Sequence, residues 1–197
     1  YFRHARSIDW LTRQMLDEFP GGRLSLSVQI RQWRSRTLLE GCPVEGDRIS
    51  LKTVEEYADP DRVLTLFQML AKQRLQLSRE AEGHLSESLA VLAERLPTGA
   101  ALWEKVRQIL LGPEVAHSLR VMHALGILEL ILPEFHGVDA LVVRDAYHRY
   151  TVDEHTFLIL ETLHALRQPV NEWAEGFSSI LQEVEEPELL YLAAILH

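Results

Sequence analysis

Hydrophobic positions along most of the chain recur every three or four residues, which is the spacing of amphipathic helices. Residues 1–19 keep this spacing until Pro20 and two glycines end it. From Thr53 onward it continues, and prolines and glycines divide it into segments. The later helices predicted in this way span approximately residues 62–75, 79–96, 98–110, 114–125, 128–132, 153–167, 170–183 and 187–197.

The period changes between residues 23 and 52. Apolar and polar residues alternate over residues 24–30, and a second short run, 48–51, follows Glu45-Gly46-Asp47. Alternation places the apolar side chains on one face of a strand. We therefore expect one short antiparallel pair here, and not a sheet of four or more strands. The predicted fold class is mainly α, a helical bundle with a small antiparallel β-hairpin.

The segment Phe135-His136-Gly137 is the best candidate for a domain boundary. It would separate a helical region of residues 1–135 from a second region of residues 136–197. The first residues have the character of a mid-helix segment, and no initiator methionine is present, so both ends of the sequence are interpreted as cuts.

The composition of the chain argues against several classes of function and site. The formal net charge of −9 argues against sequence-independent nucleic-acid binding, which needs clustered positive charge. The sequence contains no run of about twenty apolar residues, so it predicts no membrane-spanning helix. The only cysteine, Cys42, excludes an internal disulfide and a thiolate zinc site, and its neighbours Gly41 and Pro43 suggest a turn. A bacterial cytoplasmic protein without membrane or nucleic-acid partners fits these features.

The nine histidines invite a metal interpretation, but most lie on predicted helices among charged neighbours. These are expected to be surface or rim residues: His4, His84, His117, His123 and His164. His155 differs, because Thr151 or Asp153 can cap its helix and place the imidazole in the first turn. His197 also differs, because it ends an apolar helix that should be buried.

A buried histidine requires a polar partner or a metal. From spacing alone, a histidine satisfied within the core is the default interpretation of His155 and His197. A shared metal site is the alternative, because imidazole nitrogens suit zinc, manganese or iron, and oxygen-rich hydrolytic sites suit magnesium or manganese.

One segment of the sequence favours the interpretation of His155 and His197 as metal ligands. Residues 145–156, Asp-Ala-Tyr-His-Arg-Tyr-Thr-Val-Asp-Glu-His-Thr, closely resemble the start of the HD domain of a known family. This family is the bifunctional uridylyltransferase/uridylyl-removing enzyme that modifies the PII nitrogen-signalling protein. Less specific patches support the resemblance in the same order along the chain: residues 1–5, 122–128, 132–135 and 190–197.

The resemblance implies that residues 1–135 follow a nucleotidyltransferase domain and that residues 136–197 begin an HD domain. His155 would be the first metal ligand and His197 the histidine of the His-Asp pair. The cofactor would be a divalent ion, Mg, Mn or Zn, and the reaction would be the release of UMP from uridylylated PII. Other metal ligands of that family would lie beyond residue 197, so these 197 residues alone are not expected to hold a complete hydrolytic site. The family's nucleotidyltransferase core, with its paired aspartates, would lie before residue 1, so the chain alone is not expected to transfer UMP.

Two alternatives remain open. The chain could be a non-catalytic helical module for interaction or regulation. It could also be an HD phosphohydrolase that acts on nucleotides, although the region before residue 135 disfavours this alternative.

Overall fold

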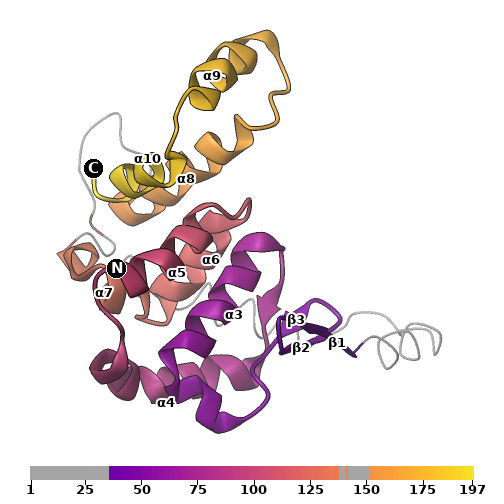
Figure 1. Cartoon of the computed structure of the whole chain (residues 1–197), viewed down its shortest axis with the longest axis vertical. Helices are drawn as coiled ribbons and strands as arrows, with labels where there is room; N and C mark the ends of the chain where they lie inside the picture. The colour runs from indigo at the N-terminus through magenta and orange to yellow at the C-terminus, as the bar shows by residue number, and fades with distance from the viewer. Residues whose placement is uncertain (1–35, 138–140, 142–150) are drawn as a thin grey trace.

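The computed structural model describes residues 36–137, residue 141 and residues 151–197, and it is mainly helical, as predicted (Figure 1). The helix predicted over residues 1–19 and the strand predicted over residues 24–30 lie outside the described residues. The helices are α3 (Pro60–Lys72), α4 (Arg79–Arg95), α5 (Ala100–Leu110), α6 (Val115–Ala124), α7 (Leu128–Ile131), α8 (Val152–Ala165), α9 (Glu172–Gln182) and α10 (Pro187–Ile195), with 3-10 turns at Val54–Ala58 and Pro133–Gly137. Each α-helix begins and ends within a few residues of its predicted range.

Local capping explains why two of these helices start where they do. The Asp59 side chain accepts a hydrogen bond of 2.9 Å from the Asp61 amide, and Pro60 occupies the first helical position of α3. Ser78 accepts a bond of 3.1 Å from the Ala81 amide at the start of α4.

The sheet is larger than the sequence pattern indicated. Its strands are β1 (Arg36–Leu39), β2 (Cys42–Glu45), β3 (Arg48–Ile49) and β4 (Gln76–Leu77), in the order β1-β2-β3-β4. The first three pair in antiparallel fashion, and β4 pairs with β3 in parallel. The small antiparallel pairing is confirmed, but the expectation of fewer than four strands is wrong. Strands of two residues are too short to produce a recognisable alternation.

A tight turn at Glu40 and Gly41 creates the β1–β2 hairpin. Both residues adopt positive φ values, 48° and 84°, which is the backbone conformation of a two-residue hairpin turn. Cys42 therefore lies in strand β2 and not in a turn, and its side chain is buried in the core. Burial raises the pKa of its thiol.

The helices form two connected groups. Helix α3 is buried along most of its length and packs against α5 and α6. Helix α8 packs on α6, and α10 packs on both α8 and α5, while α9 extends away from the other helices (Figure 1). One continuous hydrophobic core includes Phe157 of α8 and Tyr191 of α10 together with the side chains of α3–α6. Among the described residues, no helix has both the length and the apolar character needed to cross a membrane.

Candidate functional site

His155 lies in the first turn of α8, as predicted, and its side chain is half-buried. The helix begins at Val152 after the N-cap residue Thr151, whose side chain makes no capping hydrogen bond. Asp153 is not a cap either. It lies inside the helix, is buried, and faces a histidine of α6.

His197 follows the end of α10 and is exposed, so the expectation that it would be buried is wrong. Helix α10 is apolar on most sides, but it packs on α5 and α8 mainly through Tyr191 and Ile195. Leu189 and Leu196 remain 46% and 52% exposed. The apolar sequence thus predicted the helix correctly, but it did not indicate which faces of the helix would be buried.

The imidazole rings of His155 and His197 nevertheless lie next to each other. Their centroids are 6.0 Å apart, and the ring planes are inclined by 47°. Bonds from zinc to histidine nitrogen are about 2 Å long, so two rings on one ion have centroids about 5–6 Å apart. The observed separation fits that span. Whether the two histidines bind a metal stays a prediction.

Within the described residues, no group of three or more histidine, cysteine, aspartate or glutamate side chains is arranged to hold a metal ion. The chemistry of the donor set, two adjacent imidazoles, fits part of a site for zinc or manganese. These residues could therefore supply two ligands of such an ion.

A polar cluster fixes the start of α8 on α6. Arg120 donates from Nε to Glu154 at 3.1 Å and from Nη2 to the same carboxylate at 2.6 Å. Its Nη1 donates to Glu161, two turns farther along α8. The guanidinium carbon also lies 5.6 Å from the centroid of the Phe157 ring, within the range of a cation–π contact.

His123 lies one turn beyond Arg120 on α6 and is buried, so its predicted surface position is wrong. Its Nε2 lies 3.3 Å from Asp153 of α8, and its Nδ1 contacts Glu129. The ring meets Phe135 edge-on, with 5.2 Å between centroids. A ring with a carboxylate at each nitrogen can donate to both only when both nitrogens carry a proton.

A second ion pair connects α5 to α10. Arg107 donates from Nε to Glu188 at 2.6 Å, and the Glu188 side chain is only 5% exposed. This hydrogen bond lowers the pKa of the Glu188 carboxyl and raises the pKa of Arg107. Because Glu188 lies in the first turn of α10, the pair anchors the helix that His197 follows.

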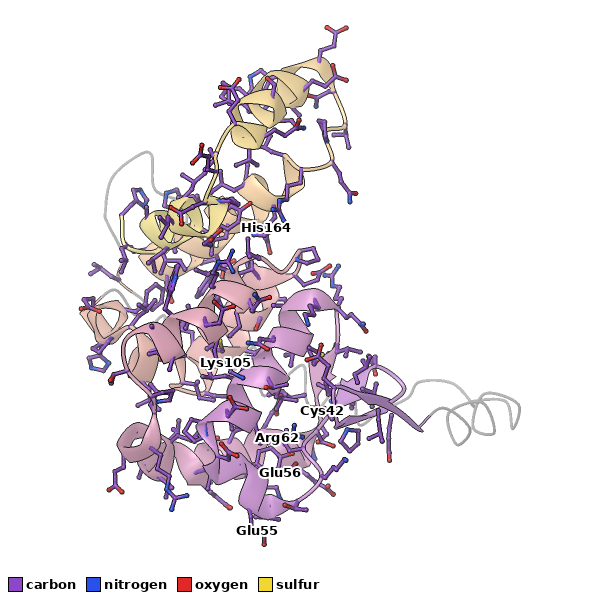
Figure 2. The ribbon with its side chains drawn as sticks, viewed as in Figure 1. Cys42, Glu55, Glu56, Arg62, Lys105 and His164 are labelled. Atoms are coloured by element: carbon purple, nitrogen blue, oxygen red, sulfur yellow. The ribbon has the colours of Figure 1, made fainter. Side chains whose placement is uncertain are left out.

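Of the other histidines predicted to lie on the surface, His164 is also buried. Its Nε2 donates to the Leu110 carbonyl at 3.0 Å, and its ring stacks on Tyr191 with 4.4 Å between centroids. Figure 2 shows it at the junction of the upper and lower helices. His117 is half-buried and its Nε2 lies 2.7 Å from the Leu75 carbonyl, whereas His4 falls outside the described residues.

Comparison with known proteins agrees with the resemblance carried by residues 145–156. A protein of Ruegeria pomeroyi is 26% identical over 208 aligned positions that cover all of this chain, and one of Azospirillum brasilense is 29% identical over 81% of it. A third, from Psychrobacter arcticus, is 42% identical over 41% of the chain. All three are named bifunctional uridylyltransferase/uridylyl-removing enzyme. The chain is homologous to these enzymes.

The chain spans less than a quarter of the length of these relatives: 9% of the Psychrobacter protein, 17% of the Azospirillum protein and 22% of the Ruegeria protein. No family model matches the chain. No solved structure matches it either.

The sequence did not reveal the residues that hold the two histidine helices in place. Arg107, Arg120 and Glu188 are charged residues on amphipathic helices, and such residues usually face solvent. The one usable signal was the clustering of Asp153, Glu154 and His155 at a helix start, but it gave no indication of their partners on α6.

Proposed function

We propose that this chain forms the beginning of the uridylyl-removing site of a bacterial, cytoplasmic PII-modifying enzyme. In this proposal residues 136–197 begin an HD-type phosphohydrolase domain, and His155 and His197 are two of its metal ligands. The observation that supports it most directly is the 6.0 Å separation of two rings that lie 42 positions apart in the sequence. The relatives' name supports the uridylyl-removing reaction.

Each histidine would have a defined task. His155, held by the first turn of α8, would present one imidazole nitrogen to a divalent ion, and His197 would present another from the exposed end of α10. A bound Mg, Mn or Zn ion lowers the pKa of its water and polarises a phosphoryl oxygen. The proposed substrate is the phosphodiester between UMP and a tyrosine of PII. The exposure of His197 leaves that side of the pair open to a protein substrate.

The activity is testable in a chimera. The chain would be lengthened past His197 with the sequence that follows the aligned segment in the Ruegeria pomeroyi relative, which covers the whole chain. We expect this protein to release UMP from uridylylated PII in the presence of Mn²⁺ or Mg²⁺, and we expect His155→Ala and His197→Ala to abolish the release. His136→Ala is the matched control, because His136 is exposed and lies in the 3-10 turn at Pro133–Gly137.

Release of UMP by the His155→Ala chimera at the rate of the unmodified chimera would refute the ligand assignment. Hydrolysis of free nucleotides but not of uridylylated PII would instead favour the nucleotide phosphohydrolase alternative. A chimera that binds PII without hydrolysing it would favour a non-catalytic regulatory module.

A further inference from the structure

The two helices of the histidine pair are anchored to neighbouring helices of the preceding region. Helix α8 is held by α6 through Arg120, and α10 is held by α5 through Arg107. Helices α5 and α6 follow each other in the chain and contact each other. We call the α5–α6 pair the platform. The relative placement of His155 and His197 therefore depends on this platform, which lies outside the proposed HD region.

The Arg120 contact restrains α8 in two ways. Glu154 and Glu161 are seven residues apart, about 10 Å along the helix axis. One guanidinium that donates to both carboxylates opposes sliding of α8 in either direction along its axis. Because Glu154, Phe157 and Glu161 lie on one face of the helix, the contact also fixes its rotation. His155 directly follows Glu154, so this rotation sets the direction of its ring.

The Arg107 contact restrains the start of α10. Glu188 is almost completely buried, and an unpaired carboxylate in that position would be strongly unfavourable. Tyr191, one turn later, is fully buried and stacks on His164 of α8. The first turns of α10 are thus held on two sides, while the helix carries the exposed His197 at its far end.

We propose that Arg107 and Arg120 are positioning residues that set the distance between His155 and His197. The two arginines act through helices α10 and α8, which carry the two histidines. The biological meaning of this inference rests on the proposed function. The claim that the arginines set the distance between the two side chains can be tested without a bound metal. It gives the helical region preceding residue 136 a direct role in assembling the candidate site.

The geometric claim is tested by cross-linking. In the 197-residue chain, His155→Cys and His197→Cys place thiols at the two positions, and a short bifunctional thiol reagent reports how often they meet. Cys42 is fully buried and does not compete. We expect Arg107→Gln and Arg120→Gln each to slow cross-linking about tenfold, the scale that corresponds to the loss of one hydrogen bond between charged groups. Glu161→Gln removes one carboxylate of the Arg120 contact on an exposed part of α8 and should slow it less.

Lys105→Gln is the matched control. Lys105 lies on α5, is 30% exposed like Arg120, and pairs at 2.5 Å with Asp61 of α3 (Figure 2). Its loss removes an ion pair from the same platform without touching α8 or α10, so cross-linking should keep its original rate. Circular dichroism of every variant identifies any that is unfolded, and for such a variant Arg120→Lys keeps the charge but loses the two-sided contact.

Zinc titration of the chimera lengthened past His197, with its native histidines, separates the two proposals, because the 197 residues alone are not expected to hold a complete set of ligands. Weaker zinc binding by the arginine variants of the chimera together with slower cross-linking supports both. Slower cross-linking, together with a chimera that binds no zinc at the histidine pair, would keep the positioning role and count against the proposed metal site. Unchanged cross-linking in folded Arg107→Gln and Arg120→Gln chains would overturn the positioning role.

Discussion

The buried ring of His164 shows how one residue ties three helices together. It lies on α8, donates to a carbonyl of α5 and stacks on Tyr191 of α10. Burial is the largest cause that lowers its pKa, to about 4, and the nearby charge of Arg167 adds to the effect. The ring is therefore neutral in the folded chain at neutral pH.

His164 should make the folded chain sensitive to acid. A folded-state pKa below the unfolded value of about 6.5 means that the unfolded chain binds the proton more tightly. Its contribution is then complete above about pH 6.5 and is lost as the pH falls toward 4, up to about 3 kcal/mol in the free energy of unfolding. Urea denaturation at several pH values should show a flatter dependence for His164→Gln than for the unmodified chain.

His84→Gln is the control for this experiment, because the partly exposed His84 lies on α4 beside Tyr57 of the 3-10 turn, and not on α5, α8 or α10. It should retain the pH dependence of the unmodified chain. An equally steep dependence in the His164→Gln variant would show that other groups cause the loss of stability in acid.

The two candidate ligands should contribute little to folding. His197 is exposed, so His197→Ala should change the free energy of unfolding by less than about 0.5 kcal/mol. His155 is half-buried at a helix start and should cost somewhat more, about 1 kcal/mol. Thermal denaturation of both variants checks these values. A loss of several kcal/mol for either would mean that the histidine is a structural residue and that its effect on activity cannot be assigned to metal binding.

At the scale of elements, the contact of α3 with the α5–α6 connection depends on one glycine. A Cβ atom on Gly112 would lie 2.4 Å from the Ala71 carbonyl oxygen of α3, and that same oxygen accepts a hydrogen bond from the Glu114 amide at 2.8 Å. Backbone atoms cannot yield as a flexible side chain can. The connection can approach α3 this closely only because Gly112 has no side chain.

Gly112→Ala should therefore destabilise the chain by about 1–3 kcal/mol, the usual cost of overpacking. Gly83→Ala is the matched substitution, because Gly83 lies within α4 and has open space where a Cβ atom would be. It should stabilise the chain by about 0.5–1 kcal/mol through better helix propensity. Chemical denaturation of both variants measures the two changes in the free energy of unfolding. A Gly112→Ala variant as stable as the unmodified chain would show that α3 shifts to accept the methyl group.

Helices were predictable from the sequence because their signals are local. Apolar spacing, the caps Asp59 and Ser78, and the glycine and proline breaks all act within a few residues of one another. The sheet was only partly predictable, because β4 is two residues long and is defined by its pairing with β3, 28 positions earlier in the sequence. Short strands carry too little pattern to be recognised without their partners.

Across the whole molecule, the candidate pair of histidines was predictable, but its support was not. A specific resemblance over residues 145–156 singled out His155, and a weaker one over residues 190–197 singled out His197. The burial of His123 and Glu188 follows from packing between segments that are far apart in the chain. The exposure of His197 was missed because an apolar helix was assumed to be covered on every side.

The continuous core leads to a prediction about how the molecule opens. Phe157 of α8 and Tyr191 of α10 share the hydrophobic core of α3–α6, and Arg107 and Arg120 join the same helices. Helix α9 buries only Ala174 and Ser178, and it exposes the adjacent rings of Trp173 and Phe177. Regions with few buried apolar contacts open with the least free energy.

Amide hydrogen exchange followed by mass spectrometry should therefore separate α9 from its neighbours in sequence. We expect α9 to exchange early, whereas α8 and α10 should be protected to the same degree as α5 and α6. A boundary near Phe135 that separated two independently folding units would produce a different pattern. In that case α8, α9 and α10 would exchange together, at a rate different from that of α3–α6. Arg120→Gln should accelerate exchange in α8 before α3, because it loosens the contact with α6 and leaves the α3 core intact.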